Sequence, residues 1–269
     1  MKRPRKLTAF PKDFLQGIRG VLHDFDDTVT EGGQFPAASL LRLEQIRKNN
    51  LILALITGRP AGWVDFLARM LPFQAVVGEN GGFYAVMEKK GLRFHYVQSS
   101  ALRLKNRDRL EKIAQRVLRL VPGSRPAADN PYRQCDIAID FAEDVTRLPE
   151  AKVQKIAAIF RKAGAQAKIS SIHVNAWFGD YDKLTTTQRL FDEVLGIDLN
   201  HCEEDFLFLG DSPNDEPMFR HFSNSVGCAN IKPYLKSLQF PPRWITQNTG
   251  AAGFCSAIDL LLQPRSKSR

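Results

Sequence analysis

The sequence predicts an α/β fold, a doubly wound parallel sheet of the Rossmann-like type with a second α+β domain inserted into it. Two segments, residues 51–56 and 206–209, are apolar at every position, as strands covered by helices on both faces must be. Segments with helical periodicity stand between such strands, and this alternation is typical of parallel sheets. Between residues 100 and 178 apolar and polar residues instead alternate, which indicates a sheet with one uncovered face.

The first block of the chain predicts a strand, a helix, a strand, a helix and a third strand. The first strand lies within residues 17–24, where an apolar run ends abruptly in acids. Residues 40–50 carry apolar side chains at helical spacing up to an Asn-Asn pair, and the all-apolar strand 51–56 follows. A second helix over residues 63–70 leads to a strand at 75–77.

The middle of the chain predicts two helices and two half-buried strands. Residues 110–121 and 153–160 each place apolar side chains on one helical stripe. Residues 135–141 and 171–178 alternate between apolar and polar residues, as a sheet under helices on one face would. The predicted domain boundaries are residues 13–99 and 179–262 for the core and residues 100–178 for the inserted domain.

The net charge of +9 is concentrated at the two ends of the chain. Residues 1–12 carry five basic residues and no acid, and residues 264–269 carry three basic residues. We therefore expect residues 1–12 to be a basic disordered tail and residues 263–269 to be a second basic tail. The rest of the chain is close to neutral and offers no broad basic face for a phosphate backbone, so a nucleic-acid partner is not expected.

Composition and apolar patterning also indicate in which cellular compartment the protein is expected. The longest apolar run, residues 51–56, is far shorter than the roughly 20 residues that cross a bilayer, so no membrane span is expected. The basic start of the chain is not followed by the apolar stretch of a secretion signal. The four cysteines lack the paired spacing of zinc or redox motifs, and a cytoplasmic protein with reduced thiols is expected. No sequence feature indicates an oligomeric state.

Polar residues gather just after the predicted strands, where open parallel sheets bind their ligands. These segments are Asp24-Phe25-Asp26-Asp27-Thr28, Thr57-Gly58-Arg59 and Gly210-Asp211-Ser212-Pro213-Asn214-Asp215, while Lys183 opens a helical segment after the inserted domain. Thr57 and Lys183 stand 126 residues apart, which is too long for one crossover and places the insertion between them.

These residue types suit phosphoryl transfer. Acids that converge at one sheet edge repel one another unless a divalent cation lies among them, and oxygen ligands favour Mg²⁺. The hydroxyl of Thr57 and the ammonium group of Lys183 can bind a phosphoryl group. Two acids at i and i+2, Asp24 and Asp26, can divide the work of nucleophile and of proton donor and acceptor.

The four segments together resemble the motifs of the haloacid dehalogenase-like (HAD) superfamily of phosphohydrolases. The matching residues, in motif order, are Asp24, Asp26 and Thr28, then Thr57, then Lys183, then Gly210, Asp211, Asn214 and Asp215. The long insertion resembles the larger α/β cap of the Cof-type branch, which includes sucrose-phosphate and mannosyl-3-phosphoglycerate phosphatases. The segments 79–81 and 227–230 resemble landmarks of that branch. The chain departs from the usual pattern at His23, where an apolar residue is usual, and at Asp27, where glycine is most frequent.

The resemblance implies a role for each matching residue. Asp24 would attack phosphorus, Asp26 would act as general acid and base, and Thr57 and Lys183 would hold the phosphoryl group. The implied Mg²⁺ ligands are Asp24, the backbone carbonyl of Asp26, Asp211 and Asp215. The residues expected to bind substrate are Thr28, Gly58, Arg59, Asn80, Asn214, His173 and Asn175.

Two of these expectations have open alternatives. His173, Asn175 and Trp177 share one face of a predicted strand and either contact the leaving group or belong to an exposed edge strand. Arg59 either contacts phosphate or caps the helix that follows it.

The predicted function is a Mg²⁺-dependent phosphatase that hydrolyses a small phosphorylated metabolite, a sugar phosphate, through an aspartyl-phosphate intermediate. An inserted domain of this size would cover the site and exclude macromolecules. The alternatives are a phosphomutase of the phosphomannomutase type, and a non-catalytic module that binds a phosphorylated metabolite.

Overall fold

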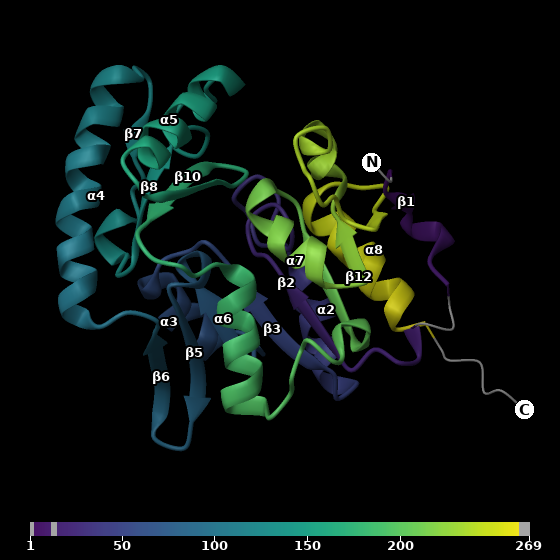
Figure 1. The fold of residues 1–269 in the computed structure, drawn as a ribbon. Coiled ribbons are helices and arrows are strands. Elements are labelled where there is room, and N and C mark those ends of the chain that lie inside the picture. Colours follow the sequence, from purple (N-terminus) through teal and green to yellow (C-terminus); the bar gives the residue numbers. More distant parts are fainter. Residues whose placement is uncertain (1–2, 12–14, 264–269) are drawn as a thin grey trace, which may run out of the picture.

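The computed structural model describes residues 3–11 and 15–263, and within these ranges the chain forms two β-sheets (Figure 1). The larger sheet has nine strands in the order β1-β13-β12-β11-β2-β3-β4-β5-β6. Its strands are β1 (Arg5–Lys6), β2 (Gly20–His23), β3 (Ile52–Ile56), β4 (Ala75–Gly78), β5 (Phe83–Glu88), β6 (Gly91–Tyr96), β11 (Phe206–Gly210), β12 (Asn224–Gly227) and β13 (Trp244–Ile245). All neighbouring strands from β1 to β4 are parallel, so the parallel core sheet predicted from the sequence is confirmed.

Helices cover both faces of this sheet. The helices α2 (Ala37–Lys48), α3 (Ala61–Met70) and α8 (Gly250–Leu261) pack on one face, and α6 (Lys183–Leu190) and α7 (Glu216–His221) pack on the other. Val21 of β2 packs with the first group and Leu22 with the second, because successive strand residues point to opposite faces. This two-sided burial is the reason that the central strands are apolar throughout. Leu40, one of the apolar residues that predict α2, is an exception to this burial, since it is 37% exposed.

A hairpin that the sequence did not predict lies at one edge of the sheet. Strands β5 and β6 run antiparallel beside β4, and Gly91 begins β6 with a φ of +112°, a conformation that favours glycine. Phe83, Tyr84, Ala85 and Val86 are all buried. The hairpin therefore extends the core beyond the parallel strands.

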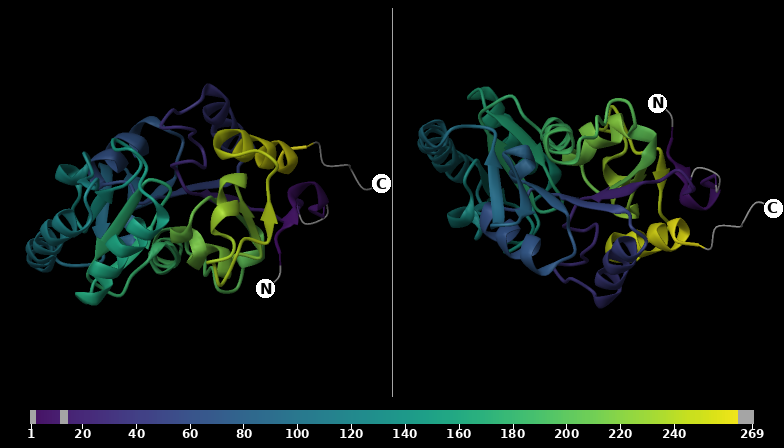
Figure 2. Two further views of the ribbon diagram at one scale, coloured as in Figure 1. Left: turned by 90° about the horizontal axis from the view of Figure 1, so that it is seen from above. Right: turned by 90° about the horizontal axis from the view of Figure 1, so that it is seen from below.

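The smaller sheet contains four antiparallel strands in the order β7-β8-β10-β9. They are β7 (Arg125–Pro126), β8 (Asp136–Asp140), β9 (Gln166–Ile169) and β10 (His173–Trp177), and they carry α4 (Ser100–Leu120) and α5 (Glu150–Lys162). Val174 and Ala176 pack against these helices, which turns His173 and Asn175 to the opposite face. Figure 2 shows this sheet and α4 at one end of the molecule, with α8 and β1 at the other.

The prediction of a disordered tail over residues 1–12 is wrong for residues 3–11. Arg5 and Lys6 form β1, which pairs with β13, and Leu7 and Phe10 are buried. The Phe10 ring lies 4.9 Å from the ring of Trp244. Basic composition obscured these two apolar anchors, whose burial offsets the entropy of ordering the segment. Residues 1–2, 12 and the predicted tail residues 264–269 lie outside the described residues.

The described part of the chain contains no helix whose length and apolar character would let it span a bilayer. Its four cysteines are free, with Cys135 and Cys228 buried and Cys202 and Cys255 partly buried. The expectation of unpaired thiols is therefore confirmed.

His23, the polar residue at the end of β2, is fully buried between aromatic rings. Its ring centroid lies 5.5 Å from that of Phe73 and 5.3 Å from that of Phe254. Nδ1 donates a hydrogen bond of 2.7 Å to the backbone carbonyl of Asp24, and Nε2 has no partner among the described residues. This arrangement requires a neutral imidazole.

We expect the contribution of His23 to the free energy of unfolding to fall as the pH falls below 6.5, opposite in sign to the contribution of the buried acids with raised pKa values. Burial lowers the pKa of His23 from 6.5 to about 4, although the bond to the Asp24 carbonyl opposes this shift. Between these pH values the unfolded chain binds a proton that the folded protein excludes, which removes up to about 3 kcal/mol of stability. Urea unfolding in EDTA between pH 4 and pH 8 measures this contribution as the difference between the two proteins: the unfolding free energy of His23→Leu should rise relative to that of the wild type as the pH falls. Equal slopes in the two proteins would contradict the prediction.

Candidate active site

Three buried carboxylates meet at the carboxyl edge of the central sheet. Asp24 follows β2, Asp211 follows β11, and Asp215 ends the turn after β11. One carboxylate oxygen from each lies within 4.8 Å of the other two. The adjacency of β2 and β11 in the sheet brings these residues together across 187 positions of sequence, as the sequence analysis expects.

Lys183, the first residue of α6, lies among these acids. Its Nζ is 3.1 Å from Asp24 Oδ2 and 2.7 Å from Asp215 Oδ1, and the side chain is only 1% exposed. Asp182 caps the helix by accepting a bond from the backbone N–H of Thr185. Gly81 permits this approach, because a Cβ there would lie 2.1 Å from the carbonyl oxygen of Asp182.

The electrostatics of the cluster are set by burial and mutual repulsion. Burial raises the pKa of Asp24 to about 7; Lys183 opposes this shift, and Asp215 and Asp26 add to it. Burial, with repulsion from Asp215, also raises the pKa of Asp211 well above its ordinary value. Burial of Lys183 is outweighed by Asp215 and Asp24, which raise the pKa of its ammonium group. A cation between these oxygens would favour their ionised forms.

Asp211 is oriented by two neighbours. The hydroxyl of Thr28 donates to Oδ1 at 3.3 Å, and Asn230 Nδ2 donates to Oδ2 at 3.0 Å. Asn230 also donates to the backbone carbonyl of Asp27, whose φ of +53° explains why glycine is frequent at that position. In this structure, Thr28, expected to bind substrate, contacts the acid cluster. Asn230 was not among the predicted site residues, although it ends the landmark segment 227–230.

Asp26 lies outside the three-carboxylate cluster because its side chain binds Arg59. Arg59 Nε and Nη2 donate to the Asp26 carboxylate at 2.9 and 2.7 Å, in a bidentate pair. Arg59 also contacts Glu143 at 2.7 Å and Asp129 at 3.4 Å, and its guanidinium stacks 4.1 Å from the ring of Trp63. These bonds are not those of a helix cap, because no side-chain hydrogen bond caps α3, which begins at Ala61.

Glu143 and His173 carry this network into the inserted domain. His173 Nε2 lies 2.8 Å from Glu143 Oε2, and the other carboxylate oxygen accepts from Arg59. Burial would raise the pKa of Glu143, but His173 and Arg59 overcome it and lower that pKa to about 2. Sequence reasoning missed Glu143, which carries no motif.

The predicted amide residues form a second chain of contacts. Asn214 Nδ2 donates to Asn80 Oδ1 at 3.3 Å, and Asn80 and Asn175 each donate to Asp136 Oδ2 at 3.2 Å. Asp136 also binds Arg133 at 2.8 Å. The inserted domain thus supplies Asn175, Asp136 and an unpredicted arginine to the same region.

The predicted loop after β3 contributes backbone and hydroxyl groups. Thr57 is buried, and its hydroxyl oxygen accepts the backbone N–H of Arg59 at 3.1 Å. The backbone carbonyl of Gly58 accepts a bond of 3.0 Å from Arg133 Nη1. Gly58 also faces Asn80, whose amide would lie 3.2 Å from any added Cβ.

A cavity of about 10 Å³ lies between the two sets of residues. Its lining includes Asp24, Asp26 and Arg59 from the core and Arg133, His173 and Asn175 from the inserted domain. β10 lies between β8 and β9, so His173 and Asn175 are not on an exposed edge strand. Trp177, in contrast, uses its indole N–H to bind the carbonyl of Tyr181. The cavity holds about one water molecule, so a larger ligand requires the inserted domain to move away.

The comparisons with known proteins concern the fold. No protein-family profile and no curated protein sequence matches the chain. Among solved structures, the Synechocystis sucrose-phosphatase in complex with sucrose and phosphate is 20% identical, with a TM-score of 0.63 over 91% of this chain and 98% of that one. A haloacid dehalogenase-like hydrolase from Bacteroides thetaiotaomicron is 18% identical, with a TM-score of 0.61 over 90% and 98%. The chain has the HAD fold.

A third structure of the same HAD fold is the C-terminal domain of trehalose-6-phosphate phosphatase from C. albicans. It is 12% identical and has a TM-score of 0.70 over 97% of this chain and 98% of that chain. The near-complete coverage includes the inserted domain, so this chain and the three solved structures share one overall fold. From here on, the inserted domain is called the cap.

Within the HAD fold, the site combines a charged cluster with a polar roof. Asp24 offers a carboxylate oxygen beside Lys183, and Asp26 lies two residues further on beside the cavity. Arg133, His173 and Asn175 offer hydrogen-bonding groups from the cap. This arrangement can bind an anion at the core and polar groups of its substituent at the cap.

Proposed function

We propose that this protein is a Mg²⁺-dependent phosphatase that hydrolyses the phosphate monoester of a small metabolite, a sugar phosphate. The observation that carries the proposal is the buried cluster of Asp24, Asp211 and Asp215 around Lys183. Burying carboxylates lowers the stability of the fold, so a buried cluster of them indicates a functional site. The similarity in fold to sucrose and trehalose-phosphate phosphatases supports the substrate class.

The donor set fits a hard divalent cation. Asp24, Asp211 and Asp215 offer only oxygen ligands, which Mg²⁺ prefers, and the backbone carbonyl of Asp26 is the further ligand that the resemblance implies. When bound there, Mg²⁺ neutralises negative charge on the phosphoryl oxygens. Thr28 and Asn230 keep Asp211 oriented for this role through their bonds to its two oxygens.

Asp24 and Asp26 carry the chemistry. A carboxylate oxygen of Asp24 forms a bond to phosphorus while the bond from phosphorus to the sugar oxygen breaks, and Asp26 gives its proton to that oxygen. Asp26 then takes a proton from water, which attacks the aspartyl-phosphate, releases phosphate and restores Asp24. Lys183 and the hydroxyl of Thr57 bind the phosphoryl oxygens. Arg59 holds Asp26 at the cavity through its bidentate bond.

The cap restricts the substrate to small molecules. A macromolecule would prevent the cap from closing over the site, and the cap side of the cavity offers hydrogen-bonding groups of Arg133, His173 and Asn175. Such groups suit the hydroxyls of a sugar. Reaction in the closed form excludes bulk water from the phosphoryl group.

The test is phosphate release from a panel of sugar phosphates and one aryl phosphate, with Mg²⁺ or with EDTA. We expect phosphate release with Mg²⁺ only. A parallel preparation of Asp24→Asn measures the background release by contaminating phosphatases. Chromatography of the sugar products separates hydrolysis from transfer. An isomerised sugar phosphate without free phosphate would establish a mutase instead, and binding without any turnover would establish a binding module.

A further inference from the structure

A basic groove lies on the edge of the core that is remote from the acid cluster. It has a volume of about 610 Å³ and is lined by the beginnings of β1, β12 and β13, the end of α7 and the segment 239–243. The catalytic residues follow the carboxyl ends of β2, β3 and β11, whereas this groove takes the amino ends of its strands. It is therefore a separate feature that the proposed phosphatase reaction does not use.

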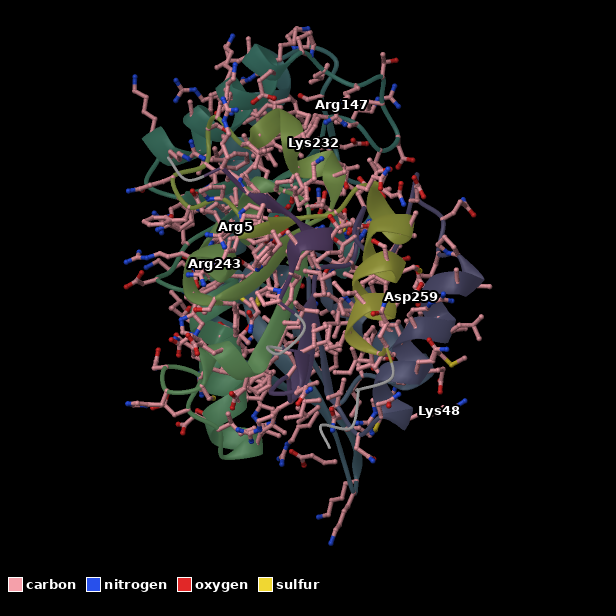
Figure 3. All side chains as sticks on the ribbon, turned by 90° about the vertical axis from the view of Figure 1, so that its right-hand side faces the viewer. Arg5, Lys48, Arg147, Lys232, Arg243 and Asp259 are labelled. Carbon is pink, nitrogen blue, oxygen red and sulfur yellow. The ribbon has the colours of Figure 1, made fainter. Side chains whose placement is uncertain are left out.

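Four arginines line the groove, and none of them has a neutralising partner among the residues that the structure describes. They are Arg3, Arg5, Arg220 and Arg243, and no acidic residue is among the lining residues. Within residues 3–11 and 15–263, none of the four guanidinium groups lies within 4.0 Å of a carboxylate. The adjoining residues outside these ranges, 1–2 and 12–14, contribute two lysines and one aspartate to the sequence. Figure 3 shows Arg5 and Arg243 side by side, as their backbone hydrogen bond of 2.9 Å requires.

The wall of the groove also contains aromatic rings. Trp244 is 4% exposed, and its indole N–H has no acceptor among the described residues. The nitrogen of this indole is itself buried, so the Trp244 side chain faces the groove with its ring rather than with its donor. The Arg5 guanidinium lies 5.7 Å from the Trp244 ring, and that of Arg220 lies 4.9 Å from the ring of Phe240. Four guanidinium groups and the aromatic rings of Trp244 and Phe240 thus line one site.

We propose that this groove binds a small anion that carries two or more phosphate groups. Four guanidiniums without acids attract a ligand of high negative charge, and each can bind phosphate oxygens through two parallel N–H groups. The groove volume is in the range of pockets that bind small molecules, which favours a compact ligand over an extended polymer. Inorganic tripolyphosphate and nucleoside triphosphates share this chemistry.

Titration calorimetry of the full chain in EDTA, with inorganic tripolyphosphate and with ATP, tests the proposal. We expect saturable binding of one ligand per chain, with affinity reduced at least tenfold in Arg220→Gln/Arg243→Gln. The matched control, Lys48→Gln/Lys162→Gln, removes the same charge outside the groove and should bind within twofold of the wild type. Equal affinity for both probes assigns recognition to the phosphates, and tighter binding of ATP adds a contact with the nucleoside.

A second variant tests the aromatic wall separately from the charge. Trp244→Phe keeps an aromatic ring beside Phe10 and Arg5, and we expect binding within about threefold of the wild type. A loss as large as that of the arginine pair would show that the guanidinium charges are not what binds the ligand. Thermal unfolding midpoints identify any variant that fails to fold. Asp24→Asn should bind as the wild type does, which separates the groove from the catalytic site. Three further results would overturn the proposal: no binding at millimolar probe, equal losses in the arginine and lysine pairs, or preferred binding of RNA with affinity that increases with length.

Discussion

Asp24→Asn is expected to lose phosphate release while its fold becomes more stable at pH 8. Without Asp24, the proposed nucleophile, no aspartyl-phosphate forms for water to hydrolyse. The rate should therefore fall at least about 10³-fold. Burial raises the pKa of Asp24 to about 7, above its ordinary value of 3.8. The folded protein therefore holds a proton that the unfolded chain releases, and the wild type loses stability as the pH rises between these values. Asparagine has no charge to bury, so the variant avoids this loss.

The measurements are initial rates with Mg²⁺ and urea unfolding in EDTA at pH 5 and pH 8. The gain in unfolding free energy of Asp24→Asn over the wild type should be larger at pH 8 than at pH 5. Asp65→Asn, an exposed acid that pairs with Arg69 on α3, is the matched control and should retain full activity. Full activity of Asp24→Asn would refute the role of Asp24 as the nucleophile. A variant less stable than the wild type at pH 8 would refute the electrostatic argument.

Lys183→Met is expected to lose both activity and stability. Lys183 is the basic partner of Asp24 and Asp215, and its removal leaves buried acids without that counter-charge. Breaking a buried ion pair from one side costs about 3–5 kcal/mol. The rate should fall at least about 10²-fold because one phosphate-binding charge is lost. The remaining carboxylates take up protons as the pH falls, so the stability loss should be smaller at pH 5 than at pH 8.

The same rate and unfolding experiments test Lys183→Met, with Lys112→Met on the exposed face of α4 as control. The control should change the unfolding free energy by less than about 0.5 kcal/mol. Both site variants are thus expected to lose activity, but their stability at pH 8 is expected to change in opposite directions. If Lys183→Met were as stable as the wild type, Lys183 would not be neutralising the acids.

The sequence predicted the parallel core because the physics of that region is local. Strands buried on both faces must be apolar throughout, as residues 51–56 are, and helices between them have their own period. Asp24, Lys183 and Asp211 could be named because each stands at the end of a strand or the start of a helix. Parallel topology then brings such positions to one edge.

The partners of those residues could not be read in the same way. Arg59 binds Asp26, Asp129 and Glu143, which lie 33, 70 and 84 positions away in sequence. An arginine or an acid in a loop has no period or spacing that identifies its partner. The antiparallel hairpin β5–β6 was missed for a related reason, since its strands read as short apolar runs until a neighbour pairs with them.

The sequence by itself therefore determined the alternating core, the place of the insertion and the acids and lysine at the carboxyl edge of the sheet. The tertiary structure alone decided that Asp26 binds Arg59, that Glu143 and Arg133 join the site from the cap, and that residues 5–6 complete the sheet. The reason is that backbone periodicity and burial act over a few residues. Ion pairs and edge strands instead depend on which distant segments the folded chain brings within hydrogen-bonding distance.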